Sequence, residues 1–242
     1  MATIAGVTSP RRLSVLFLLP LLLLLAAGCG SADTSSSSST KTTEKAECTY
    51  TAGGTAAKKA SVPPGTPPSD EPTSLTIATN RGDVKISLDA DKAPCTVNSF
   101  TSLAKQGYFD GTKCHRLVNQ GIFVLQCGDP SATGQGGPGY SFPDELTDSD
   151  PRLQPCAGQV DPTSGKEVCT YTAGTLAMAN AGPDTNGSQF FLVYKDSPLP
   201  AAYTVFGKMS AAGLKVVQDV AKGGLAADQT APKTTVTITS VK

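Results

Sequence analysis

The stretch MANAGPDTNGSQFF, residues 178–191, is the most informative part of this chain. It has neither the alternation of a strand nor the 3.6-residue period of a helix. An apolar start gives way to turn-forming residues, and the run ends on Gln189, Phe190 and Phe191. Side-chain amides beside aromatic rings, on loops held by strands, are typical of a shallow site that binds peptide groups.

A second informative block lies upstream, where residues 114–118 read CHRLV and residues 121–129 read GIFVLQCGD. In a strand, Val124 and Gln126 share a face, so Phe123 would need a bulge or bend to join them in one site. The two blocks, in this order, resemble the signature of cyclophilin-type peptidyl-prolyl cis/trans isomerases. The resemblance covers roughly residues 75–242. It implies a mostly β fold, a closed eight-stranded antiparallel barrel capped by two α-helices.

The resemblance also implies a reaction, which is rotation about the peptide bond before proline. Arg116 would be the catalytic residue, because a guanidinium that hydrogen-bonds the prolyl nitrogen binds the twisted amide better than the planar one. No nucleophile, cofactor or metal is required. The resemblance places a pocket for the proline ring at Phe123, Val124, Phe191 and Leu199. The substrate backbone would be bound by Gln126 and by the backbone at Asn180. The adjacent surface would be lined by Ala179, Ala181, Gln189 and Tyr203.

Several positions depart from the family pattern. Tyr203 stands where many members have a histidine, and Val124 stands where Met is common. The chain has no Trp, and Pro198 lies near the position of the family's frequent pocket Trp. Because Arg116 and the ring pocket are retained, we expect activity to survive. Binding of cyclosporin-type ligands is less expected without the Trp.

The first 28 residues predict an export signal. Arg11 and Arg12 precede an apolar run, residues 13–25, that is shorter than the ~20 residues needed to span a bilayer. Small residues then lead into Cys29. One interpretation is an ordinary signal peptide. The favoured one is a bacterial lipobox, with Cys29 carrying lipid such as palmitate and anchoring the protein to the outer side of the cell membrane.

Residues 29–73 predict a disordered tether. A serine run occupies residues 35–39, and five prolines lie between residues 63 and 72. Such a composition buries too little apolar surface to offset the entropy of ordering. The remaining residues, 74–242, are enough for one domain with a core.

The charge balance and histidine content exclude several classes of protein. The formal net charge is zero, which gives no electrostatic footprint for nucleic acid. His115 is the only histidine, which excludes a metal site built from several histidines. The expected partners are proline-containing polypeptides and, through the anchor, the membrane; the expected state is a monomer.

Six cysteines remain when Cys29 is set aside, and export permits disulfides. Spacing does not determine the pairing. We expect Cys95 with Cys114 and Cys156 with Cys169, leave Cys48 and Cys127 unassigned, and keep free buried thiols as the alternative. Residues 148–169 are expected to be an insertion closed by the second pair. The hexapeptide CTYTAG occurs at residues 48–53 and again at 169–174.

Residue patterns predict a mostly β chain with two helices. The helices are expected to run from Pro94 toward Gly107, with Val97, Phe100, Leu103 and Ala104 inward, and over residues 211–221, with Leu214, Val217, Val220 and Ala221 inward. The expected strands are residues 74–79, 84–88, 113–118, 123–127, 174–179, 190–193, 203–209 and 234–241.

Three functions remain open from the sequence alone. The first is an isomerase that speeds folding of exported proteins, since uncatalysed isomerisation takes ~10–100 s. The second is a chaperone or module that binds proline-containing segments without useful turnover. The third, a solute-capturing lipoprotein, predicts two lobes around a deep cleft, and the length and strand spacing argue against it.

Overall fold

The structure is a computed structural model that describes residues 46–147 and 150–242. The predicted export signal, Cys29 and the first part of the predicted tether lie outside the described residues. Within the described ranges, no helix has both the length and the apolar character needed to cross a membrane.

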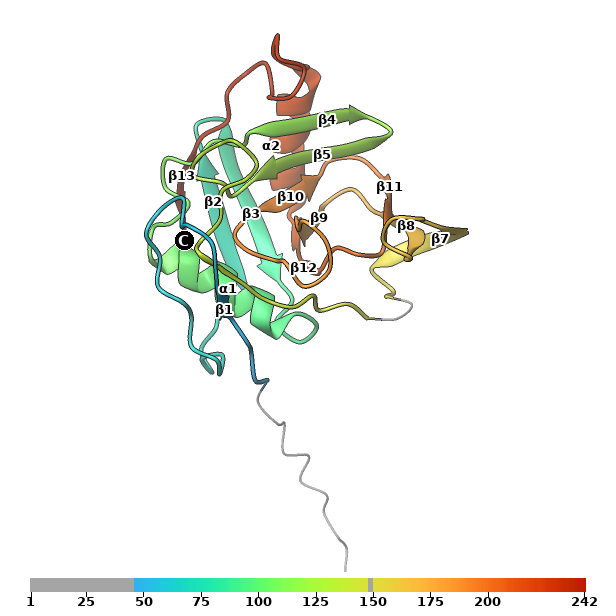
Figure 1. Cartoon of the computed structure of the whole chain (residues 1–242). Helices are drawn as coiled ribbons and strands as arrows, with labels where there is room; N and C mark the ends of the chain where they lie inside the picture. Colours follow the sequence, from blue (N-terminus) through green and yellow to red (C-terminus); the bar gives the residue numbers. More distant parts are fainter. Residues whose placement is uncertain (1–45, 148–149) are drawn as a thin grey trace, which may run out of the picture. The chain divides into compact units, whose positions relative to one another are not determined.

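Eight strands form one antiparallel sheet that curls around the core (Figure 1). In order across the sheet these are β13 (Ile238–Val241), β2 (Ser74–Thr79), β3 (Gly82–Leu88), β12 (Val205–Met209), β9 (Thr175–Met178), β10 (Phe190–Val193), β5 (Ile122–Cys127) and β4 (Arg116–Gln120).

The two edges of this sheet meet through the segments that precede β4 and β13. The N–H of Cys114 donates to the carbonyl of Val236 at 3.0 Å, and the N–H of Ile238 donates to the carbonyl of Thr112 at 2.8 Å. The predicted eight-stranded architecture is therefore confirmed. Loop hydrogen bonds, rather than a ladder between β4 and β13, join its edges.

The β2–β3 hairpin follows from alternation, as expected. Val84, Ile86 and Leu88 on β3 are buried, and the residues between them are exposed. Gly82 has a φ of +124°, a conformation that L side chains rarely adopt. A glycine at this point lets the chain reverse between the two strands.

Two helices pack against the sheet, α1 (Pro94–Lys105) and α2 (Ala211–Lys222). The four predicted inward residues of α1 are all buried. Pro94 fits the first turn because it needs no N–H there. The α2 helix begins where the Ser210 hydroxyl accepts a hydrogen bond from the N–H of Gly213. Val217 and Val220 are buried as predicted, and the other two predicted residues are half-buried.

The apolar residues form two separate clusters. The larger fills the curled sheet and contains Phe100. The centroid of its ring lies 5.4 Å from that of Phe190 and 5.2 Å from that of Phe206. The smaller contains Tyr171, Phe191 and other residues of the candidate site. The larger cluster stabilises the fold, whereas the smaller one supports the functional surface.

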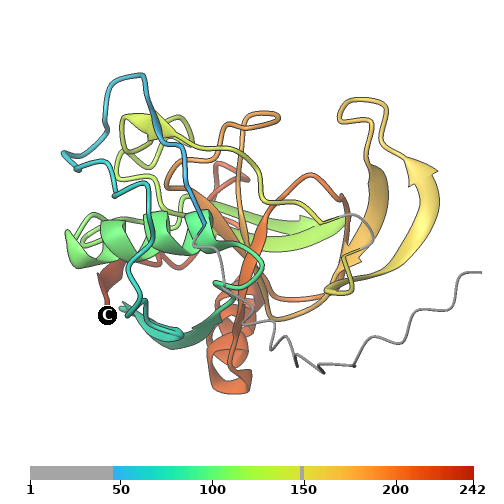
Figure 2. The same ribbon diagram turned by 90° about the horizontal axis from the view of Figure 1, so that it is seen from below.

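The predicted insertion forms a hairpin of β7 (Leu153–Val160) and β8 (Glu167–Tyr171). Strand β11 (Ser197–Pro200) pairs with β8 and completes a three-stranded sheet. Cys156 and Cys169 are bonded across the hairpin, as expected. Residues 148 and 149 lie outside the described residues. We call residues 153–171 the insertion hairpin; both views show it at the opposite end of the domain from α1 (Figures 1 and 2).

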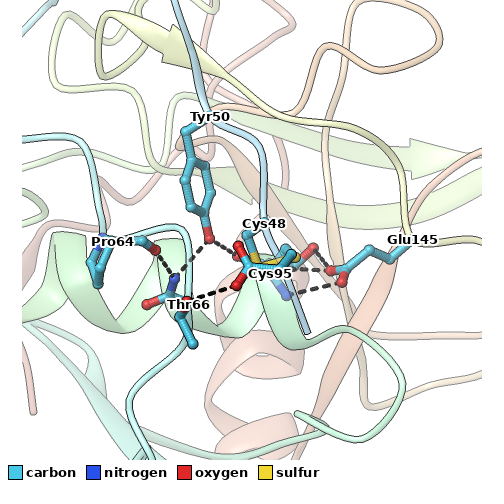
Figure 3. The surroundings of a disulfide bond; sticks show 9 residues. Cys48, Tyr50, Pro64, Thr66, Cys95 and Glu145 are labelled. Atoms are coloured by element: carbon cyan, nitrogen blue, oxygen red, sulfur yellow. Dashed lines mark hydrogen bonds between the residues drawn. A yellow bond between two sulfur atoms is a disulfide. The ribbon is translucent and has the colours of Figure 1, made fainter. Parts of the chain in front are cut away.

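The prediction of a tether through residue 73 is wrong for its second half. Residues 48–66, here called the N-terminal segment, pack on the domain. Cys48 is bonded to Cys95 in α1, and β1 (Thr51–Ala52) pairs with β6 (Tyr140–Ser141). Figure 3 shows this attachment. The disulfide and the ring of Tyr50, which packs on Tyr140 at 5.7 Å, order a segment whose composition alone predicts disorder.

The expected bond between Cys95 and Cys114 is also wrong. Cys114, which precedes β4, instead forms a disulfide with Cys127 at the end of β5, and their Cα atoms are 4.0 Å apart. The register that pairs Arg116 with Gln126 brings these two cysteines together. Cys95 is therefore free to bind Cys48, which the sequence left unassigned.

Candidate active site

The β4–β5 ladder places Arg116 directly opposite Gln126. A guanidinium nitrogen of Arg116 donates to Oε1 of Gln126 at 3.1 Å. Nε2 of Gln126 in turn donates to Oε1 of Gln189 at 2.8 Å. A chain of hydrogen bonds thus orients an exposed guanidinium, whose planar fork of donors is suited to directional hydrogen bonds.

Gln189 is itself held by a neighbouring loop. Its Nε2 donates to the carbonyls of Gly134 and Gly136 at 2.9 and 3.0 Å. The loop is organised by the buried carboxylate of Asp129, which accepts hydrogen bonds from Ser131 and from the N–H groups of both glycines. Burial alone would raise the pKa of Asp129, but these hydrogen bonds outweigh it and lower the pKa. The carboxylate therefore stays ionised and keeps the loop in place.

Beside Arg116 lies a small cavity of about 120 Å³, which we call the ring pocket. Its apolar wall consists of side chains from three strands, Ile122 and Val124 on β5, Phe191 on β10 and Leu199 on β11. The ring of Tyr203 meets that of Phe191 edge to face at 5.5 Å. A flat apolar ring could enter this pocket while its edge remains next to the guanidinium.

Most of the predicted site residues come together at this cavity. Eight of them line the ring pocket: Arg116, Val124, Gln126, Ala179, Asn180, Phe191, Leu199 and Tyr203. Ala181 and Gln189 instead line an adjoining cavity of about 320 Å³, together with Gly53 and Gly54 of the N-terminal segment. The sequence prediction missed this contribution because it assigned the segment to the tether.

Phe123 does not lie in the ring pocket, which corrects the prediction. The β4–β5 ladder runs without a register shift, so the bulge that Phe123 would need is absent from this hairpin. Its ring faces the other side of the sheet, 5.9 Å from the ring of Tyr194 and 4.3 Å from Nζ of Lys195. Ile122, two positions before Val124, lines the ring pocket instead. Plain strand alternation would have identified Ile122.

Tyr171 is a second residue that the sequence analysis missed. Its hydroxyl lies 3.2 Å from the carbonyl of Pro200 and 3.1 Å from that of Tyr203, and accepts from the N–H of Tyr203. Its side chain is fully buried, and burial raises its pKa, so the hydroxyl stays neutral and able to donate. Tyr171 therefore holds the backbone that presents Tyr203 and Leu199.

The side chain of Asn180 also holds the segment that leads to Tyr203. Its Nδ2 donates to the carbonyl of Ala202 at 2.9 Å and lies 3.3 Å from Oδ1 of Asp144. These contacts commit the side chain to structure. The predicted contact with substrate concerns the backbone of Asn180, which these side-chain contacts leave available.

Neither metal ligation nor histidine chemistry is supported by the described residues. The potential ligands that cluster there are Cys156, Glu167 and Cys169, and the two cysteines are joined in a disulfide. The ring nitrogens of His115 are buried and have no hydrogen-bond partner among the described residues, and burial lowers the pKa of the imidazole. The site therefore offers a fixed cation, side-chain amides and an apolar pocket.

Comparison with known proteins agrees with this arrangement. Residues 74–242 match the family model of the cyclophilin type peptidyl-prolyl cis-trans isomerases. A probable peptidyl-prolyl cis-trans isomerase B of Mycobacterium leprae is 48% identical over 202 residues, and that of Mycobacterium tuberculosis is 45% identical over 207 residues. Each alignment covers 81% of this chain, but only 66% and 63% of the respective relative. This chain thus matches about two thirds of the length of its mycobacterial relatives.

Solved structures show the same likeness. The crystal structure of a cyclophilin type peptidyl-prolyl cis-trans isomerase from Cryptosporidium parvum superposes with a TM-score of 0.54 and 28% identity. The match covers 70% of this chain and 95% of the other. A second crystal structure of that protein, obtained in the presence of the dipeptide Ala-Pro, matches with a TM-score of 0.53, also at 28% identity, and covers 69% of this chain and 96% of the other.

Proposed function

The chain belongs to the cyclophilin-type peptidyl-prolyl cis-trans isomerase family, and we propose that it accelerates rotation about peptide bonds that precede proline. The observation that carries this proposal is the position of Arg116, whose guanidinium borders the apolar ring pocket. The solved relative crystallised in the presence of Ala-Pro supports a proline-containing peptide as the occupant of the pocket.

The chemistry follows from the electronic structure of the amide. The peptide bond resists rotation by about 18–20 kcal/mol because nitrogen donates its lone pair to the carbonyl. As the bond twists, the lone pair returns to the prolyl nitrogen, which becomes a hydrogen-bond acceptor. A donor from Arg116 then binds the twisted state better than the planar one, and this difference lowers the barrier.

The surrounding residues orient the two partners of that interaction. Val124, Phe191 and Leu199 hold the proline ring by apolar contact. Gln126 orients the guanidinium by accepting a hydrogen bond from it, and Gln189 orients Gln126 in the same way. Because the donor is already in place, little reorganisation is needed when the amide twists.

The decisive experiment removes the guanidinium. In the full chain, we expect Arg116→Ala to lower kcat/KM for a proline-containing peptide by about 100-fold, the effect of losing one transition-state donor elsewhere. Peptide affinity and melting temperature should change little, because the side chain is exposed. Arg116→Lys is the matched control, and its single rotatable ammonium should restore only part of the rate. Unchanged turnover in Arg116→Ala would refute the catalytic role of this residue, whereas a wild-type chain that binds the peptide without turning it over would favour a binding module.

We further propose that the isomerase works outside the cytoplasmic membrane, held by lipid on Cys29, and assists the folding of exported proteins. The support is the sequence around Cys29, with its apolar run and small residues. Expression of the wild-type chain and a Cys29→Ser variant in a bacterial host tests this. Detergent partitioning and mass spectrometry should show acyl chains on the wild type only. A wild-type protein without acyl chains would refute the anchor and leave the catalytic proposal intact.

A further inference from the structure

Another cavity, distinct from the one beside Gln189, adjoins the ring pocket on the side of the insertion hairpin. We call it the second cavity. It has a volume of about 720 Å³. One wall is the tip of the insertion hairpin, including Asp161 and Lys166, and the opposite wall is the loop that contains Pro183 and Asp184. Tyr203 closes the end nearest the ring pocket.

The two cavities are parts of one surface. Asn180 and Tyr203 line both of them. Strand β11 also connects them, because Leu199 lines the ring pocket and the next residue, Pro200, lines the second cavity. A polypeptide whose proline occupies the ring pocket can therefore place a neighbouring side chain in the second cavity without a change in the fold.

The walls of the second cavity are held by buried groups. Strand β8 pairs with β11, with Cys169 opposite Leu199. The Tyr171 hydroxyl, on the same strand, holds the backbone of Pro200 and Tyr203. At the base of the hairpin, Arg152 donates to Asp89 and to the carbonyl of Val205 on the main sheet. These contacts fix strand β11 and the base of the insertion hairpin on the main sheet.

The lining combines apolar surface with negative charge. Leu146, Pro183, Pro200 and Tyr203 contribute apolar area. The charged residues of the lining are three aspartates, Asp144, Asp161 and Asp184, and one lysine, Lys166.

Among residues 46–147 and 150–242, the hydrogen-bond donors to these carboxylates are all neutral groups. Asp144 accepts from the N–H of Asp184, and Asp184 accepts from the N–H of Asp144. Asp161 accepts from the N–H and hydroxyl of Ser164. Such bonds fix the carboxylates in place but leave their charge uncompensated, so the cavity has an excess of negative charge.

We propose that the second cavity is a specificity subsite for a basic side chain, arginine or lysine, that lies close to the isomerised proline in the substrate. Such a side chain has an apolar stem, which suits the apolar walls, and a cationic head, which suits the carboxylates. This inference rests on the proposed isomerase function and adds to it a substrate class: proline-containing segments with a nearby positive charge.

The test compares matched peptides on the full chain. The peptides differ only by arginine or alanine, placed in turn at the first and second positions before and after the proline. We expect kcat/KM to be about fivefold higher for arginine at one of these positions, the size of a favourable exposed ion pair. High salt should reduce this ratio because the carboxylates remain partly exposed to solvent.

The variant that tests the cause is Asp161→Asn combined with Asp184→Asn. Asparagine keeps the side-chain oxygen at both sites, and it tolerates the left-handed φ of +59° at residue 184. The arginine-to-alanine ratio should fall to less than about twofold. Asp219→Asn is the matched control, because that aspartate is exposed on α2, pairs with Lys215 and does not line the cavity. The control should retain the full ratio.

The outcomes separate this inference from the proposed function. Equal kcat/KM for arginine and alanine at all positions would refute the subsite, while turnover of the alanine peptides would still support the isomerase. A ratio that survives in the double variant would also refute it. If no peptide were turned over, the proposed function would fail. Calorimetric affinities would then decide the inference: tighter binding of an arginine peptide that the double variant abolishes supports it, and equal affinities overturn it.

Discussion

The hexapeptide CTYTAG occurs at residues 48–53 and 169–174, and its two copies have similar roles in different surroundings. In each, the cysteine is buried and forms a disulfide. In each, the tyrosine hydroxyl hydrogen-bonds backbone carbonyls, Cys95 for Tyr50 and Pro200 and Tyr203 for Tyr171. Each copy attaches an added segment to the domain.

The two attachments differ in reach. The first copy joins the N-terminal segment to α1, 47 residues away, and its Gly53 lines the cavity beside Gln189. The second joins neighbouring strands of the insertion hairpin, 13 residues apart. The same six residues therefore serve a long-range and a short-range attachment. Their surroundings, rather than the hexapeptide, decide how much stability each disulfide contributes.

The largest effect should come from the long-range disulfide. Replacing Cys48 and Cys95 together by serine should lower the free energy of unfolding by about 4 kcal/mol, because the bond closes a long loop in the unfolded chain. Urea unfolding in a non-reducing buffer measures this change. A loss below about 1 kcal/mol would show that the N-terminal segment is held mainly by Tyr50 and its neighbours.

Removal of the short-range disulfide should cost less. Replacing Cys156 and Cys169 by serine should lower the free energy of unfolding by about 3 kcal/mol on the same loop-closure relation. The ladder between β7 and β8 remains to hold the hairpin. The same urea titration compares both variants, and a greater loss here than in the first variant would contradict the contrast in reach.

A third prediction concerns the ionic anchor of the insertion hairpin. Arg152→Met should lower the free energy of unfolding by about 2 kcal/mol, because it leaves the buried carboxylate of Asp150 without its cation. Adding Asp150→Asn should recover part of this loss, since the uncompensated charge is then gone. Hydrogen exchange should become faster in β7 and β8 and remain unchanged in β1. Faster exchange in β1 would mean that the two attachments are coupled.

The smallest effect is the pH dependence of that anchor. Burial alone would raise the pKa of Asp150, but hydrogen bonds and charge from Arg152 outweigh it, so the pKa is lowered from 3.8. The stabilising contribution is therefore complete above pH 3.8 and is lost as the pH falls through the lowered pKa. Urea unfolding between pH 5 and pH 2 should show a steeper loss in the wild type than in Asp150→Asn. Parallel curves would contradict this assignment.

Local patterns predicted the elements of the domain well. Alternation identified the β2–β3 hairpin, and the 3.6-residue period identified the inner face of α1. Element ends were less accurate, because β4 begins at Arg116 rather than Lys113 and continues to Gln120. The short strand β11 was missed, since its two prolines argue against a strand unless the partner strand is known.

The candidate site was predicted through its two motifs, and the errors have clear causes. Arg116, Val124 and Phe191 meet as the resemblance implied. Phe123 was misplaced because the family analogy overruled the alternation of a regular strand. Tyr171 was missed because its role depends on backbone groups about 30 residues away, which no local pattern reveals.

The amino-acid sequence by itself determined the helices and most of the strands, because periodicity and turn chemistry act between near neighbours. Its two motifs supplied, through the family resemblance, the residues that meet at the ring pocket. Only the tertiary structure decided the partners of Cys48 and Cys114, the order of the N-terminal segment and the cavity formed by the insertion hairpin. These features join residues far apart in the chain. Their meeting depends on how the whole sheet curls, and the register of β5 likewise turns Phe123 away from the site.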